Sequence, residues 1–186
     1  MRAPTPGLVV ACLLSIAALA VGAQAAHALS VTVTGRSGAA TISALTLHDN
    51  VLGNWLGSMT LNYSLTGGTY TAPGTATLGT VTGGAFTIAS PAGWTLRLLT
   101  PFTITSSLSL LADGSIGVTI PDFAFTITNA LGTLTYRGSV SFLLNSSGTT
   151  LAVTSSSFTN ARTGAVLTFL TPANFSVSPA IAWRSI

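Results

Sequence analysis

Apolar and polar residues alternate with a period of two through most of this chain. The pattern is clearest in GTLTYRGSVSFLL at Gly132–Leu144, where aliphatic or aromatic residues fill nearly every second position and Thr, Ser and one Arg lie between them. This period puts apolar side chains on one face of a β-strand and polar side chains on the other. The chain contains no Lys and no Glu, so strong helix formers are scarce. The sequence therefore predicts an all-β protein.

Turn residues rich in Gly, Pro, Asn and Asp separate the alternating stretches. Short strands joined in this way are typical of antiparallel architectures. We expect one domain at residues 29–186, built as an antiparallel β-sandwich of about eight to ten short strands. The alternative is a small closed β-barrel, for which the chain has enough residues to supply about eight strands.

Four local features sharpen this expectation. The apolar phase changes at Ala44 and again at Pro121-Asp122, where a β-bulge would keep both phases on one face. Asp113-Gly114 is typical of a tight hairpin. Residues 69–82 contain Pro and Gly and predict an edge strand or an irregular pair. Residues 49–57, DNVLGNWLG, have apolar residues at helical spacing and predict a short helical turn with Asp49 as its cap.

The N-terminus has the pattern of a secretory signal peptide at residues 1–28. One Arg precedes an apolar run at residues 8–21, and small-x-small sites predict cleavage after Ala25 or after Ala28. Retention of the run as a membrane anchor is the alternative, although it is shorter than the roughly 20 residues that a membrane-spanning helix needs. The lone Cys12 belongs to this segment. We expect no transmembrane helix in the mature chain, and a secreted or cell-surface location.

The mature chain carries almost no charge. After residue 28 the sequence has five Arg and three Asp and no Cys, which excludes disulfides and thiol chemistry. The arginines are scattered along the chain, whereas nucleic-acid binding depends on clustered cations that neutralise phosphates. We therefore expect no nucleic-acid partner.

Few residues are suited to catalysis. His48 and Asp49 are the candidate catalytic residues, with His48 as a base in a Ser-His-Asp arrangement, although no G-x-S-x-G pattern is present. A polar cap before a turn is the simpler interpretation of this pair. Asp113 in the expected hairpin turn and Asp122 at the expected bulge have structural explanations, so they are not candidates for a catalytic carboxylate pair. The His and Cys content is too low for a usual zinc site. We expect no cofactor, no metal and no enzymatic activity.

The candidate binding residues are Trp94, Trp183 and Trp55. An exposed Trp can stack on a sugar or anchor at a lipid interface, but packing inside the protein is the more common role. Thr-x-Thr repeats give the strands nearly neutral hydroxyl faces. Because little charge opposes association at sheet edges, self-association or contact with cell-envelope components is expected.

The compositional pattern is similar to a known group of proteins. The Ala-rich leader through Ala28, the Ser/Thr-rich strands and GAVLTFLTPANFSVSPA at residues 164–180 carry the likeness. In these features the chain resembles small exported Ala/Gly/Ser/Thr-rich β proteins of high-GC actinobacteria. The resemblance implies export and a β fold, and it supplies no site residue.

Three functions follow, in order of preference. The first is a secreted or cell-surface, non-enzymatic β protein with a structural, adhesive or binding role. The second is a small β-barrel of the cell envelope, or one carrying an apolar ligand. The third is a hydrolase of unknown class.

Overall fold

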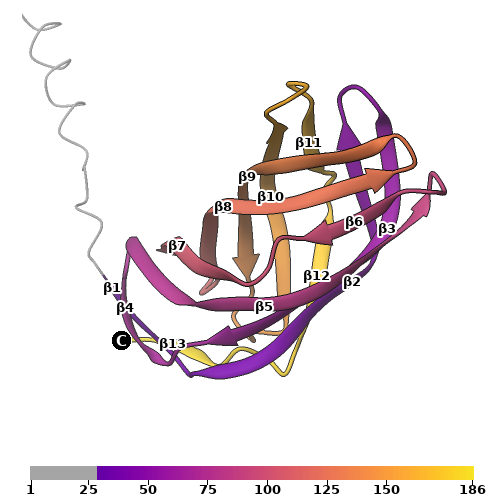
Figure 1. Cartoon of the computed structure of the whole chain (residues 1–186). Helices are drawn as coiled ribbons and strands as arrows, with labels where there is room; N and C mark the ends of the chain where they lie inside the picture. The colour runs from indigo at the N-terminus through magenta and orange to yellow at the C-terminus, as the bar shows by residue number, and fades with distance from the viewer. Residues whose placement is uncertain (1–28) are drawn as a thin grey trace, which may run out of the picture.

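The computed structural model describes residues 29–186, and the expected signal peptide at residues 1–28, with both cleavage sites, lies outside them. The described residues form thirteen β-strands and no helix (Figure 1). The strands are β1 (Leu29–Val33), β2 (Arg36–Asp49), β3 (Gly53–Leu65), β4 (Gly68–Ala72), β5 (Gly74–Ser90), β6 (Thr95–Leu98), β7 (Phe102–Leu110), β8 (Ile116–Asn129), β9 (Gly132–Leu144), β10 (Thr150–Asn160), β11 (Val166–Phe169), β12 (Ala173–Ser178) and β13 (Trp183–Ser185).

Every strand pairing among these residues is antiparallel. A small sheet has the order β13-β1-β4. In the larger sheet, pairing passes from β2 through β3, β5, β7, β8, β9 and β10 to β12, which pairs again with β2. The pairing is thus ring-like, but the strands lie in a sandwich-like arrangement and do not form a barrel. The predicted all-β antiparallel class is confirmed.

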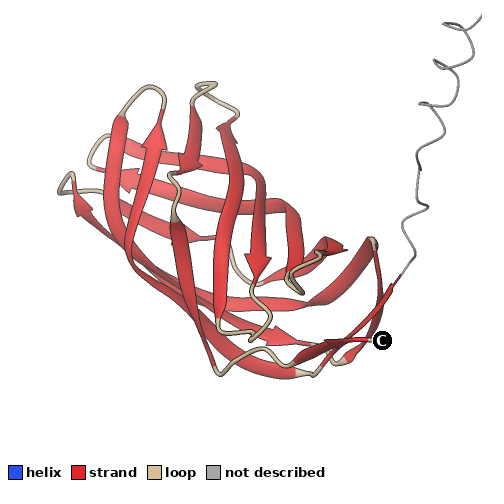
Figure 2. Cartoon of the chain, turned by 180° about the vertical axis from the view of Figure 1, so that it is seen from behind, coloured by secondary structure: helices blue, strands red, loops and turns tan. Residues whose placement is uncertain are grey.

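Two layers of strands cross each other at a steep angle. In Figure 2 the β2–β3 hairpin and strands β10, β11 and β12 stand upright in front of strands that run across behind them. Long strands that bend at bulges can pass from one layer to the other in such an arrangement. The small sheet lies at the opposite end of the molecule from the β2–β3 hairpin tip (Figure 1).

The bulge expected at Pro121-Asp122 is confirmed. The β8–β9 register shifts between Ile120 and Phe123, so both of these side chains are buried while the two residues between them are exposed. Figure 1 shows both strands turning sharply near their middle. The phase change near Ala44 corresponds to a second register shift, in the pairing of β2 with β3. In both places one extra residue bends the strand and preserves the apolar face.

The helical turn expected at residues 49–57 is wrong. Residues 50–52 form a tight turn, and β3 begins at Gly53, which has a φ of 86°. Asp49 is a cap, but of the turn: its Oδ1 accepts hydrogen bonds from the backbone N–H groups of Val51 and Leu52, each at 2.8 Å. Pairing of β3 with both β2 and β5 satisfies its backbone more fully than one isolated helical turn would.

The irregular or edge strand expected at residues 69–82 is two strands with different roles. β4 joins the small sheet, while β5 lies inside the larger sheet between β3 and β7. Pro73 separates them and so interrupts no ladder. Short strands such as β4, β6, β11 and β13 explain why the described residues contain more strands than the eight to ten expected.

The core differs in composition from one end to the other. Toward the β2–β3 and β8–β9 turns it is filled by aromatic rings: Phe158 packs against Phe123, Phe125 and Phe169 with centroids 5.1–5.7 Å apart. Toward the small sheet the buried residues are almost all aliphatic. Aliphatic side chains fill less volume than aromatic rings, so the two ends need not be packed to the same density.

Candidate functional site

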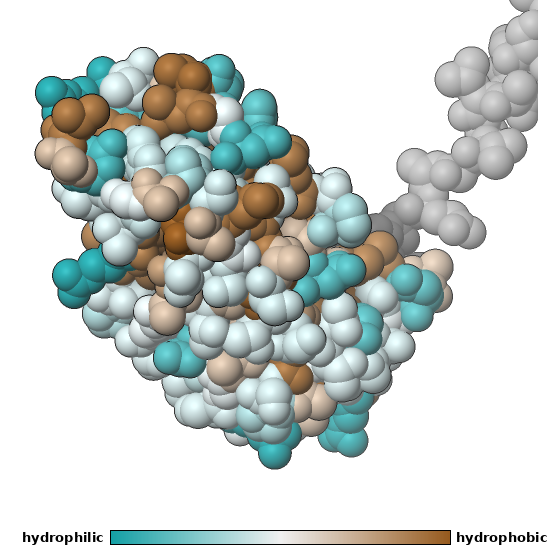
Figure 3. Space-filling model, turned by 90° about the vertical axis from the view of Figure 1, so that its right-hand side faces the viewer, coloured by the Kyte–Doolittle hydropathy of each residue, from teal (hydrophilic) through white to brown (hydrophobic). Residues whose placement is uncertain are grey.

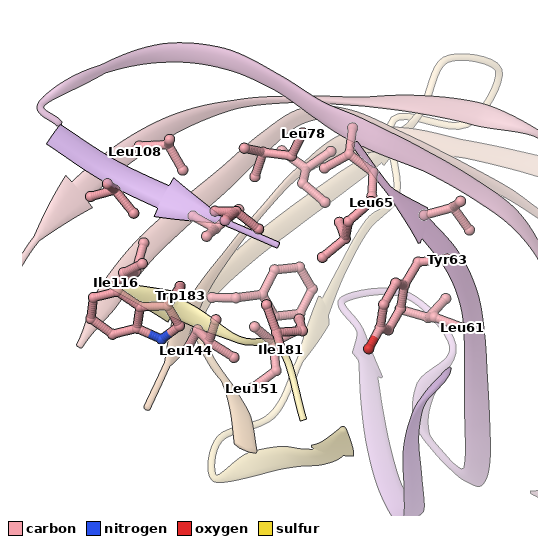
Figure 4. Close-up of a pocket in the computed structure, with 17 residues that line it drawn as sticks. Leu61, Tyr63, Leu65, Leu78, Leu108, Ile116, Leu144, Leu151, Ile181 and Trp183 are labelled. Atoms are coloured by element: carbon pink, nitrogen blue, oxygen red, sulfur yellow. The ribbon is translucent and has the colours of Figure 1, made fainter. Parts of the chain in front are cut away.

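An apolar cavity of about 110 Å³ lies at the aliphatic end of the core (Figure 4). Strands from both layers and from the small sheet surround it. No charged side chain lines it. The seventeen lining residues are Val31, Val33, Leu61, Tyr63, Leu65, Leu78, Val81, Ile104, Leu108, Ile116, Val118, Ile120, Phe142, Leu144, Leu151, Ile181 and Trp183.

The period of two in the strands aims these side chains inward. Ile116, Val118 and Ile120 alternate along the first half of β8, and each points to the same face as its neighbours two residues away. Beyond the bulge, the same face of β8 carries Phe123 and Phe125. Along this face of β8, branched aliphatic residues line the cavity before the bulge, and phenylalanines fill the core after it.

Partly exposed side chains mark the edge of the cavity. Leu65, Val118, Leu151, Ile181 and Trp183 line it and are only half-buried, unlike most of the lining. Figure 4 shows the Trp183 indole beside Leu144 and Ile116, at the margin of the group. The lining is therefore least covered by the rest of the protein at these residues.

Strand β13 and the segment before it close this end. The backbone N–H of Ile181 donates to the carbonyl of Gly148 at 2.9 Å, which ties the segment to the β9–β10 turn. Trp183 pairs with Val33 of β1. Its indole Nε1 is buried and has no hydrogen-bond partner among the described residues. The backbone N–H of Thr34 also donates to the carbonyl of Ala182 at 2.9 Å, so the cover of the cavity is a short segment tied to both β1 and the β9–β10 turn.

The Tyr63 hydroxyl contributes little polarity to the cavity. It donates a hydrogen bond to the carbonyl of Pro179 at 3.3 Å and so is already occupied. Burial raises the pKa of Tyr63, and the nearby positive charge of Arg36 offsets part of that rise. The phenol therefore stays neutral at physiological pH, and the lining presents no ionised group to a ligand.

The candidate catalytic pair lies near the β2–β3 turn, at the aromatic end of the core. Asp49 is fully buried, and its Oδ2 accepts a hydrogen bond from the Tyr136 hydroxyl at 2.7 Å. With the two turn N–H groups, the carboxylate has three donors, which compensate its loss of water. These contacts give the Asp49 carboxylate a structural role, in which it caps the turn and joins β2 to β9.

His48 faces away from Asp49. Its ring is exposed, and Nδ1 lies 2.7 Å from Oδ1 of Asn54 across the β2–β3 hairpin. Adjacent residues of a strand point to opposite faces, which separates the two candidate groups. The structure therefore does not bring His48 and Asp49 together, and no described Ser or Thr hydroxyl is hydrogen-bonded to His48.

The buried phenol of Tyr136 predicts alkaline sensitivity. Burial, followed by the hydrogen bond to Asp49 and that carboxylate's charge, raises the pKa of Tyr136 far above the ordinary value of 10.0. Below about pH 10 the phenol is protonated in both folded and unfolded chains, so the stability is unaffected. Above that pH the unfolded chain loses the proton first, and the free energy of unfolding falls by about 1.4 kcal/mol per pH unit for this group. Urea unfolding measured from pH 9 to pH 11.5 should show the decline.

The Tyr136→Phe variant provides the control for this pH dependence. It lacks the titrating hydroxyl, so its free energy of unfolding should fall less steeply above pH 10 than that of the wild type. Equal slopes for the two proteins would contradict the assignment of the effect to Tyr136.

The three tryptophans lie in different places. Trp55 is buried, and its ring centroid lies 5.3 Å from that of half-buried Trp94. Trp183 lines the cavity at the other end of the molecule. Of the candidate binding residues, only Trp183 thus belongs to the cavity. Most lining residues were missed by the sequence reasoning, although the run Ile116, Val118, Ile120 followed by Phe123 carried the signal.

Two further observations concern metals and membranes. Residues 29–186 hold no group of three or more His, Cys, Asp or Glu side chains placed to share a metal ion. Among the same residues, no helix is long and apolar enough to cross a membrane.

Comparisons with other proteins add no family or function. No family model, no curated protein and no solved structure matches this chain.

Proposed function

We propose that this protein is a non-enzymatic binding protein that takes a small, uncharged, mainly hydrocarbon ligand into the cavity beneath β1 and β13. The observation that carries the proposal is a cavity of about 110 Å³ whose seventeen lining residues include no charged side chain. Water in such a space finds almost no hydrogen-bonding partner, whereas an apolar molecule gains contacts on all sides.

The size of the cavity limits the ligand. An engineered apolar cavity of about 150 Å³ in another protein stays dry and binds benzene. A volume of about 110 Å³ is therefore suited to a benzene-sized molecule or to one end of an alkyl chain that continues through the margin at Val118 and Leu151. An ionic head group would have to remain outside, because burial of an unpaired charge is costly.

The surroundings of the candidate catalytic residues favour binding over hydrolysis. Asp49 is committed to the turn and to Tyr136, and exposed His48 bonds Asn54. Neither residue lines the cavity. A catalytic group needs to lie within hydrogen-bond reach of its substrate, so a ligand in the cavity would meet no candidate acid or base.

Benzene titration tests the proposal. We expect benzene to raise the thermal unfolding midpoint in a concentration-dependent manner, since a ligand of the native state stabilises it by mass action. In ¹H–¹⁵N spectra the shifts should concentrate on β8, β9 and the Trp183 indole N–H. Val118→Phe should weaken the affinity by at least about tenfold, because the added ring occupies the ligand's space.

Val166→Phe is the matched control. Val166 in β11 is half-buried like Val118 but lies outside the cavity, so this variant should bind benzene as the wild type does. The proposal is wrong if benzene shifts resonances elsewhere, or if Val118→Phe and Val166→Phe bind it equally well.

Export is part of the same proposal. The apolar run at residues 8–21 and the small-x-small sites after it support secretion or a cell-surface location for the mature domain. A protein outside the cytoplasm would meet small apolar molecules directly, without the need for a charged or catalytic site.

A further inference from the structure

Four turns gather at the end of the molecule opposite the cavity. They are residues 50–52, 91–94, 130–131 and 161–164, here called the tip surface (Figure 1). Hydrogen bonds connect neighbouring turns: Val166 N–H donates to Oδ1 of Asn50 at 2.8 Å, and Nδ2 of Asn160 donates to the carbonyl of Thr135 at 3.0 Å. Thr95 pairs with Thr128, which sets the 91–94 turn beside the end of β8.

Large aliphatic side chains project from this tip surface. Leu131 is 95% exposed, Val51 69% and Leu52 45%. In Figure 3, which views this side of the molecule, hydrophobic patches lie on the upper part and are separated by more hydrophilic residues. Exposed aliphatic residues at the tips of separate turns do not stabilise the fold, because they contact little of it.

Charge at the tip surface is positive. Arg162 lies in one of its turns, and Arg97 lies in β6 just behind another; both are exposed. The nearby carboxylate of Asp49 is buried and hydrogen-bonded. The exposed carboxylates of the described chain lie elsewhere: Asp113 is in the β7–β8 turn, and Asp122 is paired with Arg137 at 3.1 Å.

Trp94 adds an amphipathic ring to the same surface. It is half-buried, and its indole packs against Trp55 with centroids 5.3 Å apart, which fixes its position in the turn. Trp is enriched where apolar and aqueous phases meet, because its ring is apolar and its N–H is polar.

We propose that the tip surface docks the protein on an anionic lipid surface. A stable protein partner usually covers about 800 Å² of continuous surface, whereas polar residues separate the hydrophobic patches on this side (Figure 3). The projecting side chains can each enter the boundary between lipid head groups and acyl chains, while Arg97 and Arg162 attract the lipid phosphates. The contact is peripheral and reversible, and it does not depend on whether the cavity holds a ligand.

Vesicle co-sedimentation tests this proposal. We expect the protein to bind vesicles of phosphatidylglycerol and phosphatidylcholine, to bind pure phosphatidylcholine vesicles several-fold more weakly, and to be released by added salt. The double variant Val51→Ser/Leu131→Ser should lower the partition coefficient by about tenfold or more, since it removes the two most exposed aliphatic side chains of the surface. Arg162→Gln should lower it by about fivefold.

Leu111→Ser/Ile186→Ser is the matched control. Leu111 and Ile186 are 40% and 67% exposed and lie outside the tip surface, so this double variant should bind vesicles as the wild type does. Wild-type unfolding midpoints would show that the variants are folded, which is expected because all four side chains are exposed. Should a tip variant fail to fold, Arg162→Gln alone tests the surface.

Three results would overturn the proposal: no binding to the anionic vesicles, equal binding by the wild type and the folded tip variants, or an equal loss in the control. If Val51→Ser/Leu131→Ser left vesicle binding intact but abolished self-association in sedimentation velocity, the tip surface would be a contact between copies of the chain.

Discussion

Phe158→Ala is expected to lower the free energy of unfolding by about 3–5 kcal/mol. The ring is fully buried and touches the rings of Phe123, Phe125 and Phe169. Its removal would leave a space that strands tied on both sides by backbone hydrogen bonds cannot close, so cavity formation adds to the lost burial. Guanidinium chloride unfolding, analysed with a common m-value, measures the loss.

Phe102→Ala is the control for that experiment. Phe102 is only half-buried and contacts a single ring of this cluster, that of Phe123, so its loss should cost clearly less. If the two variants were equally destabilised, the cluster around Phe158 would not be the principal source of stability at this end of the core.

Asp49→Ala is expected to cost about 2–4 kcal/mol. The substitution removes the acceptor of the buried Tyr136 hydroxyl, and an unsatisfied buried donor costs about 1–3 kcal/mol. It also removes the acceptor for the N–H groups of Val51 and Leu52, a loss similar to that of a helix cap, at about 1 kcal/mol. Chemical unfolding near pH 7 measures the sum.

Asp113→Ala is the control for Asp49→Ala, because it removes a turn-capping carboxylate that is not buried. Asp113 is an exposed turn residue that accepts one hydrogen bond, from the N–H of Ser115 at 2.9 Å, so its replacement should cost less than about 1 kcal/mol.

A double-mutant cycle of Asp49→Ala with Tyr136→Phe should show coupling, because both variants remove the same hydrogen bond. Additive effects would mean that the contact contributes nothing of its own.

The two ends of the molecule have different physical characters. The aromatic end is filled, is held by the bond between Tyr136 and Asp49, and carries the exposed aliphatic side chains of the tip surface. The other end is aliphatic and holds the cavity beneath the small sheet. The two roles that we propose, contact with a lipid surface and uptake of an apolar molecule, are thus assigned to opposite ends of the molecule.

Local sequence determined the alternating character of the strands, most of the turns and the two expected bulges. The phase shift at Pro121-Asp122 required one extra residue in β8 between the buried Ile120 and Phe123, because without it one of the two apolar rows would be exposed. The helical turn at residues 49–57 was mispredicted because its spacing suits a helix. The same residues can also form a capped turn followed by a strand. Only the pairing of β3 with β2 and β5 decides between the helical turn and the strand.

Tertiary structure alone decided which strands pair and what they enclose. Ser176 of β12 pairs with Thr41 of β2, and Tyr136 donates to Asp49, although these partners are far apart in the chain. Periodicity reports which face of a strand is apolar, but it has no information about the strand that will cover that face. The cavity exists because aliphatic halves of several strands meet at one end and fill less space than the aromatic halves at the other, which is a property of the assembled sheets.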